Sequence, residues 1–259
     1  MNTYILLTCC TGLMLGIVLV TNKVFLIPYL THHVPQYHVW MQDPDIQATT
    51  ASEPLTLQAE FAMQRSWRED HDKLTFISTL PFDASMVNRG SQEEQKAMLG
   101  DINLFISMAE EEDGSESLVG EVEIMIATRH DQLKGYGRAA LLTFIRYVLR
   151  HEQELLQEYD GASKYTKFDY LRAKVKETNC RSIGLLESLG FVKTEPTPNW
   201  FEEFELRLVG PTEDKVDQLM RQRGIEGYRE GLYTQRPGKT SRPVNGGGAL
   251  DATSAQLSQ

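Results

Sequence analysis

A loop at residues 132–140, with the sequence QLKGYGRAA, constrains the fold of this chain more than any other segment. It follows an apolar, strand-like run that ends at Ala127, and it opens a helix in which apolar residues recur with helical spacing. Two glycines let the backbone approach a ligand without a Cβ atom in the way, and the free N–H groups of a helix start attract anions. Lys134 and Arg138 add positive charge. The segment therefore predicts a phosphate-binding loop between a strand and a helix.

Strand-like runs alternate with helical patterns around this loop. We predict strands over residues 23–27, 74–80, 98–107, 118–127, 168–175, 191–193 and 201–209, and helices over 34–41, 57–68, 137–158, 179–189 and 211–223. The polar stretch 81–96 reads as a long loop. Early strands follow one another as hairpins and later ones alternate with helices, which predicts an α/β (α+β) fold with a mixed sheet flanked by helices.

The chain divides into four predicted parts: an apolar N-terminal segment (1–20), the main domain (21–210), a helical extension (211–233) and a disordered tail (234–259) rich in small and polar residues. Residues 4–20 carry no charge, which is borderline for a membrane span of about 20 apolar residues. Gly12 and Gly16 interrupt the run, and no basic n-region or cleavage pattern accompanies it. A membrane anchor, a buried element and a gene-model extension remain open for this segment.

Composition excludes some classes of function. The net charge of −10 argues against a nucleic-acid partner, because such binding needs clustered Lys and Arg. Cys9, Cys10 and Cys180 form neither a disulfide framework nor a zinc-site spacing, so a reducing compartment such as the cytoplasm is expected, with membrane anchoring as the alternative. His32 and His33 are not spaced as ligands on a helix, which favours a packing or surface role, and no metal site is expected.

The glycines of the loop also fit the dinucleotide fingerprint G-x-G-x-x-G/A. In that fold the first glycine directly follows the strand, whereas here the polar stretch 128–134 separates Ala127 from Gly135. An acidic residue at the end of the next strand, about 20 positions on, is missing as well. A dinucleotide-binding protein is therefore only a remote alternative.

Gln132, Gly135 and Gly137 match the signature Q/R-x-x-G-x-G/A, and this stretch resembles the acetyl-CoA loop of the GNAT acetyltransferase superfamily. The helix at 179–191, NCRSIGLLESLGF, looks like the N-x-x-S/A-x-x-L-x-x-x-x-G-F helix of the RimJ/RimL-like branch. Segments 50–57, 61–67, 100–105 and 120–127 further resemble the N-acetyltransferase 9-like family. The resemblance covers about residues 19–233. It implies a GNAT fold with a mostly antiparallel sheet, acetyl-CoA as cosubstrate, and acetylation of an amine on a protein or peptide.

The resemblance also implies site residues. Coenzyme binding is expected from Ile124, Met125, Ile126, Gln132, Leu133, Lys134, Gly135, Tyr136, Gly137, Arg138, Asn179 and Ser182. Asn179 is equally suited to capping the helix that it opens. Ser52 and Glu53 are candidate walls of the acceptor groove.

The reaction requires a neutral amine. An α-amino group with a pKa of about 7.7–8.0 is partly neutral at pH 7, whereas a lysine near 10.4 is almost wholly charged, so an N-terminal α-amine is the expected acceptor. Glu123 is the expected general base. Glu121 lies on the same face of the strand, and the repulsion between the two carboxylates, or their burial, is expected to raise the pKa of one of them. A pair of merely solvated carboxylates is the alternative. Cys180 has no histidine nearby in the sequence to activate it, so a direct transfer is expected.

Many GNAT enzymes place a tyrosine acid after the leucine of the Asn179 helix, and Leu186 occupies that position here. A coenzyme-A-binding interaction module with weak or no turnover is therefore the second hypothesis. The thiolate leaving group, with a solution pKa near 8.5, tolerates the loss of an acid.

Overall fold

The computed structural model describes residues 16–82, 90–161 and 164–233 of the chain. The expected disordered tail, 234–259, and residues 1–15 of the apolar N-terminal segment lie outside these ranges.

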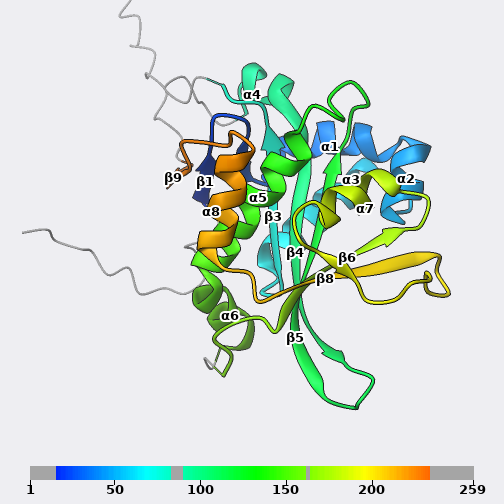
Figure 1. Ribbon diagram of the computed structural model, residues 1–259. Coiled ribbons are helices and arrows are strands. Elements are labelled where there is room, and N and C mark those ends of the chain that lie inside the picture. The colour runs from blue at the N-terminus through cyan, green and yellow to red at the C-terminus, as the bar shows by residue number, and fades with distance from the viewer. Residues whose placement is uncertain (1–15, 83–89, 162–163, 234–259) are drawn as a thin grey trace, which may run out of the picture.

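The described part is built on a nine-stranded sheet with the order β7-β8-β6-β5-β4-β3-β2-β1-β9 (Figure 1). Neighbouring strands are antiparallel except β5 and β6, which run parallel. The strands are β1 (Ile17–Val20), β2 (Phe25–Pro28), β3 (Lys73–Thr79), β4 (Met98–Glu110), β5 (Glu116–Ile126), β6 (Tyr170–Lys176), β7 (Val192–Lys193), β8 (Glu203–Val209) and β9 (Arg229–Leu232). The mixed, mostly antiparallel sheet expected from the sequence is confirmed.

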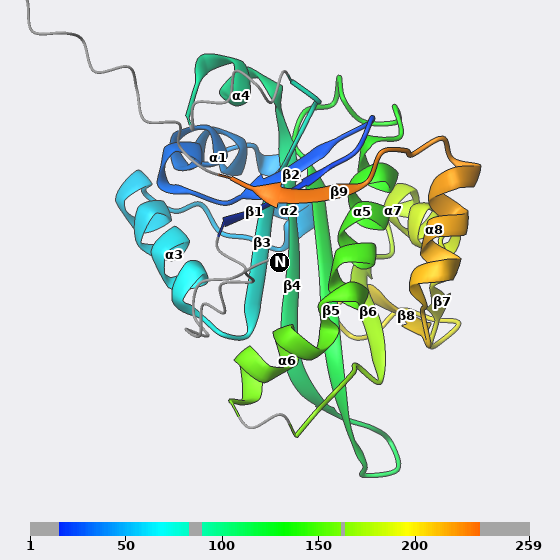
Figure 2. The same cartoon turned by 90° about the vertical axis from the view of Figure 1, so that its left-hand side faces the viewer.

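Helices cover both faces of this sheet. They are the 3-10 turn η2 (Thr31–His33), α1 (Val34–Met41), α2 (Pro44–Thr50), α3 (Leu57–Glu69), α4 (Gln92–Ala97), α5 (Tyr136–Arg150), α6 (Glu152–Asp160), α7 (Cys180–Glu187) and α8 (Glu213–Gln222). Figure 2 shows α1 and α3 on one side of the sheet and α5 and α8 on the other. Several helix starts are set locally, because the Thr56, Asn179 and Thr212 side chains accept hydrogen bonds from backbone N–H groups at the starts of α3, α7 and α8.

Residue alternation along β4 separates two cores. Ile102 and Leu104 are fully buried in the cluster that includes Phe144 of α5. On the other face, Ile77 and Met125 pack with Tyr37 and other side chains of α1. Because side chains alternate between the faces of a strand, Asp101 and Asn103 of β4 lie on the α1 side, and so do Glu121 and Glu123 through their register with β4. The carboxylates of β4 and β5 are therefore gathered on one face.

The two ends of the described chain meet at one edge of the sheet. β1 pairs with β2, and it also pairs with β9 over four residue pairs. The Tyr233 N–H also donates to the Gly16 carbonyl at 2.6 Å. Residues 17–20, the end of the apolar run, thus form a strand. No helix in the described part of the chain is long and apolar enough to span a bilayer.

Two local expectations were wrong. The helix predicted over 137–158 is broken at His151 into α5 and α6, because His151 adopts φ −111° and ψ 21° and its Nε2 atom lies 2.8 Å from Glu230 Oε2 on β9. The predicted loop 81–96 contains the start of α4, where the Ser91 hydroxyl accepts from the Glu94 N–H at 3.2 Å. Each deviation depends on a short-range cap or a distant partner that periodicity does not reveal.

Candidate active site

A cleft opens where β5 and β6 separate. The two strands pair only through Val119–Glu121 and Tyr170–Arg172, and beyond this point they diverge. The cleft has a volume of about 250 Å³, and its lining includes Glu121–Met125 of β5, Ala173–Lys176 of β6 and Asn179, Ser182, Leu185 and Leu186 of α7. A parallel pair that splays after three rungs thus leaves a strand edge open to a ligand.

The backbone of β5 faces this cleft at alternate residues. The Ala127 N–H donates to the Leu99 carbonyl of the β4 side at 2.8 Å, so the odd-numbered residues of β5 direct their main-chain groups toward β4. Even-numbered residues face the other way, as the Leu118 carbonyl does when it accepts from the Asp169 N–H at 2.9 Å. The N–H groups of Ile124 and Ile126 therefore point away from β4, toward the side on which the cleft opens, and that of Met125 points toward β4.

The glycine loop lies beside the open edge of β5, because Gly137 approaches the Ile126 and Ile124 side chains. Gln132 holds it in place, because its Nε2 atom donates to the Ile126 carbonyl at 3.0 Å. Gly135 has φ +87° and precedes α5, whose first N–H groups, on Tyr136, Gly137 and Arg138, have no partner within the helix. These groups form an anion-binding helix start. Leu133 is also left-handed, with φ +63°, and its side chain is exposed.

Two basic side chains that were expected to bind phosphate are engaged within the protein. Lys134 Nζ lies 3.3 Å from Asp131 Oδ1. Arg138 Nη2 donates to Ser188 Oγ at 3.5 Å, while its buried Nε atom has no hydrogen-bond partner among the described residues. Arg181 of α7 is the cation that sequence reasoning missed: it is exposed, and its Nη1 atom donates to Gln132 Oε1 at 3.3 Å. The sequence could have pointed to Arg181, because it lies two residues after Asn179, at the start of a helix expected to contact the coenzyme.

The start of α7 confirms one of the two roles considered for Asn179. Its Oδ1 atom accepts from the Ser182 N–H at 3.2 Å and caps the helix. Asn179 and Ser182 both line the cleft, so capping leaves them beside the ligand space. Leu186 is buried and packed in the core, so this position supplies no acid.

The two carboxylates of β5 differ in their surroundings. Glu121 accepts from Arg172 Nε at 2.7 Å, and Lys174 Nζ lies 3.5 Å from the same oxygen. Glu123 forms no ion pair with a described residue and opens into the cleft. The Glu123 side chain is exposed to the cleft, but desolvation by the groups around it, together with the charges of Glu121 and Asp101, raises its pKa to about 7. A carboxylate with this pKa is suited to accept a proton near neutral pH.

The α1 side of the cleft brings in further residues. Ser52 lines it, as expected, whereas Glu53 is exposed on the loop after α2 and is not part of the lining. Asp101, Asn103 and Tyr37 line it without having been expected. The Asp101 carboxylate accepts from Tyr37 at 3.2 Å and from Asn103 at 3.0 Å, and burial raises its pKa to about 6. The period-2 pattern of β4 could have placed Asp101 and Asn103 on this face, but not their contact with α1.

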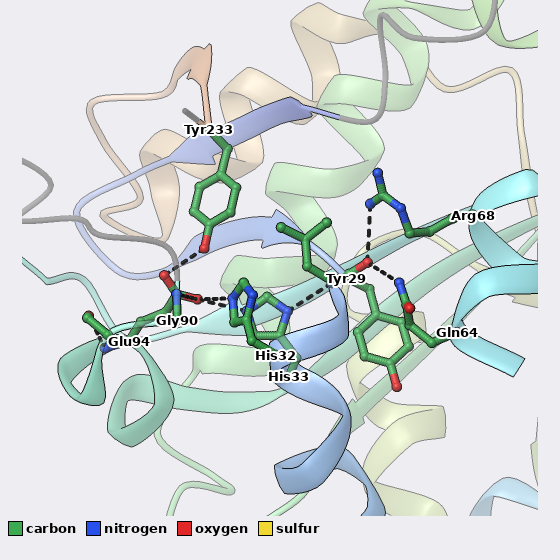
Figure 3. A network of polar contacts seen from close by, with 10 residues as sticks. Tyr29, His32, His33, Gln64, Arg68, Gly90, Glu94 and Tyr233 are labelled. Atoms are coloured by element: carbon green, nitrogen blue, oxygen red, sulfur yellow. Dashed lines mark hydrogen bonds and ion pairs between the residues drawn. The ribbon is translucent and has the colours of Figure 1, made fainter. Parts of the chain in front are cut away.

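A second polar cluster joins η2, α4 and the end of the described chain (Figure 3). Glu94 Oε1 lies 2.7 Å from His32 Nε2 and 2.8 Å from His33 Nε2, and Glu94 Oε2 accepts from the Tyr233 hydroxyl at 2.6 Å. Burial alone would raise the pKa of Glu94, but these hydrogen bonds hold it well below its ordinary value. Burial also lowers the pKa of His33.

The three side chains are close enough to share a metal ion, but the hydrogen bonds favour another arrangement. The Leu30 N–H donates to His33 Nδ1 at 3.0 Å, which places the ring proton on Nε2, facing Glu94. A metal on Nε2 of a neutral imidazole would require that proton on Nδ1, against the Leu30 N–H. The cluster therefore acts as a buried hydrogen-bonded brace, in line with the packing role expected for the histidines.

The chain is similar to known proteins in sequence and in fold. The family model described as "Acetyltransferase (GNAT) domain" matches residues 23–192. The chain is 40% identical over 173 residues to "Alpha/beta-tubulin-N-acetyltransferase 9" of Drosophila melanogaster, covering 67% of this chain and 77% of that protein. It is 39% identical over 193 residues to "N-acetyltransferase 9-like protein" of Caenorhabditis briggsae, covering 74% and 85%. A solved acetyltransferase (GNAT family) from Bacillus anthracis superimposes with a TM-score of 0.52 at 12% identity, covering 76% of this chain and 99% of that one, so it shares the fold.

Proposed function

Because the chain belongs to the GNAT acetyltransferase family, in its N-acetyltransferase 9-like branch, we propose that it transfers the acetyl group of acetyl-CoA to the α-amine of a protein N-terminus. The observation that carries this proposal is the position of Glu123. Its carboxylate, with a pKa raised to about 7, stands in a cleft that also exposes the edge of β5 and lies beside the start of α5.

The residues of the cleft fit a coenzyme with a phosphate end and an amide-bearing arm. The N–H groups of Tyr136, Gly137 and Arg138, which have no partner within α5, suit the pyrophosphate. The buried Arg138 Nε atom is a further donor without a partner among the described residues. Arg181 supplies positive charge at the same end, where Lys134 is already paired with Asp131. The N–H groups of Ile124 and Ile126 suit the pantetheine amides and the thioester carbonyl. Bound acetyl-CoA would supply the thioester, and the protein supplies orientation and a base.

Glu123 is the proposed general base. It takes a proton from the incoming ammonium, directly or through a water molecule, so that the nitrogen lone pair attacks the thioester carbon. Glu121 is held by Arg172 and Lys174, so we assign it the role of a charge that raises the pKa of Glu123. The thiolate is an adequate leaving group without an acid at Leu186.

An N-terminal α-amine suits this site better than a lysine. The pKa of an α-amine, about 7.7–8.0, lies within about one unit of the pKa of Glu123, so proton transfer to this base is easy. A lysine with a pKa near 10.4 holds its proton much more tightly. The name of the Drosophila relative makes the N-termini of α- and β-tubulin the first acceptors to test. We also propose that the enzyme acts in the cytoplasm, which fractionation of tagged full-length protein would test.

The full-length chain, acetyl-CoA, and peptides with free or blocked α-amines test the proposal. We expect transfer only to free α-amines, and a fall in kcat of about 10²–10⁴-fold in Glu123→Gln, with coenzyme A still raising the Tm. Glu116→Gln, at the exposed start of the same strand, is the matched control and should behave as wild type.

The burial of Leu186 where many family members carry a tyrosine acid favours a second function, a coenzyme-A-binding interaction module. Thermal stabilisation by coenzyme A without transfer to any peptide would support the module over the enzyme. Absence of coenzyme A binding would overturn both.

A further inference from the structure

Two large aromatic side chains stand exposed at the tip of the β7–β8 connection. Trp200 is 94% exposed and Phe201 is 68% exposed. In Figure 1 this connection projects beyond the end of β6. Large aromatic side chains that are this exposed commonly mark contact sites.

The tip is held in a defined conformation. Asn199 Oδ1 accepts from the Phe201 N–H at 2.9 Å and from the Glu203 N–H at 3.0 Å. The Glu177 N–H, just beyond β6, donates to the Glu202 carbonyl at 2.8 Å. The two aromatic rings are therefore presented on a closed turn, which lowers the entropy lost when a partner binds them.

The same turn stands at the mouth of the candidate active site. Glu203, two residues after Phe201, lines the cleft, and so does Lys176, whose Nζ atom lies 3.5 Å from Glu203 Oε1. A polypeptide whose first residue reaches Glu123 must pass through the mouth of the cleft, part of which is formed by Lys176 and Glu203. The position of the turn suits the residues that follow the reacting amine.

Charge around the tip is predominantly negative. Glu177, Glu195 and Glu202 are exposed and form no ion pair with a described residue. Lys176 is paired with Glu203, and Lys193 Nζ is placed 3.7 Å from the centre of the Phe204 ring. Aromatic faces and carboxylates together favour a cationic side chain, because Arg and Lys bind both.

We propose that Trp200 and Phe201 form a docking surface for the acceptor polypeptide just after its N-terminal residue, and that this surface selects acceptors with Arg or Lys in that stretch. The inference rests on the proposed function for its choice of partner. It adds a specificity determinant outside the reacting centre.

The test compares the double variant Trp200→Ala/Phe201→Ala with wild type on peptide pairs that share a first residue and carry either Arg or Glu at positions two to four. We expect wild type to prefer the Arg peptides. In the double variant, KM for these peptides should rise about tenfold, with kcat and the KM for acetyl-CoA within twofold of wild type. Leu232→Ala, 73% exposed on β9 at the opposite edge of the sheet, is the matched control and should change nothing.

Fluorescence anisotropy of peptides labelled at the C-terminus, with coenzyme A saturating, measures the same contact without turnover. A loss of Arg-peptide affinity in the double variant would support the docking surface even if no acetyl transfer is detected. The absence of transfer would count against the proposed function and not against the docking surface. Equal affinities of wild type and double variant, or equal affinities for the Arg and Glu peptides, would overturn the inference. The inference would also be overturned if the double variant bound both peptides as wild type does but sedimented differently in the absence of peptide. The tip would then be a contact between copies of the chain.

Discussion

Glu121 and Arg172 face each other on the last rung that joins β5 to β6, with Arg172 Nε 2.7 Å from Glu121 Oε2. The same rung is where the sheet begins to open, so the ion pair marks the inner end of the cleft. One carboxylate of β5 is neutralised there, and the next one along the same face, Glu123, is left open to the ligand space. The division of roles between two similar residues thus follows from a contact with a strand about fifty positions later in the sequence.

Glu123 should give the reaction an acid limb near neutral pH. We expect kcat/KM to rise as the pH increases through about 7, because the base must be ionised. Stability should show the opposite trend: a carboxyl whose folded-state pKa is raised stabilises the fold at low pH and loses that contribution as the pH rises through about 7. The Tm of Glu123→Gln should therefore match wild type near pH 4.5 and exceed it at pH 8, as measured by thermal scans across this range. A constant difference in Tm at all pH values would contradict the assignment.

Gly135 and Gly137 should respond differently to the same substitution. Gly135 has φ +87°, so Gly135→Ala imposes a left-handed conformation that costs an L-residue about 1–2 kcal/mol. We expect a lower Tm and a weakened affinity for coenzyme A by calorimetric titration. A Cβ atom at Gly137 would lie 3.5 Å from Ile126 Cγ1, an ordinary contact, so Gly137→Ala is a matched control with a smaller effect. Equal losses from both variants would mean that the turn conformation is not what positions the phosphate-binding N–H groups.

Arg181 should contribute to coenzyme binding without contributing to the chemical step. Arg181→Ala removes an exposed cation next to Gln132, and we expect the KM for acetyl-CoA to rise about three- to tenfold with kcat nearly unchanged, because an exposed charge-assisted contact is worth about 1 kcal/mol. Steady-state kinetics at low and moderate salt should show a smaller effect at higher ionic strength. Arg129→Ala removes an exposed arginine that precedes the loop and is paired with Asp45 of α2, and it should leave the KM unchanged.

Glu94 should be important for the stability of the fold. Glu94→Gln removes the ionised acceptor of several hydrogen bonds in a fully buried position, and we expect a loss of about 2–4 kcal/mol in the free energy of unfolding. Tyr233→Phe removes only one donor and should cost about 1 kcal/mol. Because the pKa of Glu94 is lowered in the folded state, its contribution is present above about pH 4.5 and is lost as the pH falls below that value. Urea unfolding at pH 7 and pH 4 should therefore show a smaller gap between wild type and Glu94→Gln at the lower pH, and a gap that widened in acid would refute this account.

Short-range patterns in the sequence were sufficient for most of the elements. The alternation of β5, the capping residues Thr56 and Asn179, and the glycine at 135 each act through neighbours within four residues, so their consequences were readable without a structure. The break at His151 and the helix α4 escaped this reasoning. The first depends on Glu230, 79 positions away, and the second on a cap in a stretch whose composition reads as a loop.

The sequence by itself determined that a strand, a glycine loop and a helix stand in the order that holds a phosphate, and that Glu121 and Glu123 share a face of that strand. Only the tertiary structure decided that Arg172 neutralises Glu121, that Asp101 and Tyr37 complete the wall beside Glu123, and that β1 and β9 close the edge of the sheet. The physical reason is the range of the interactions. Periodicity and capping report on backbone geometry within a few residues, whereas the charge state of a carboxylate depends on every group that folding brings within a few ångströms of it.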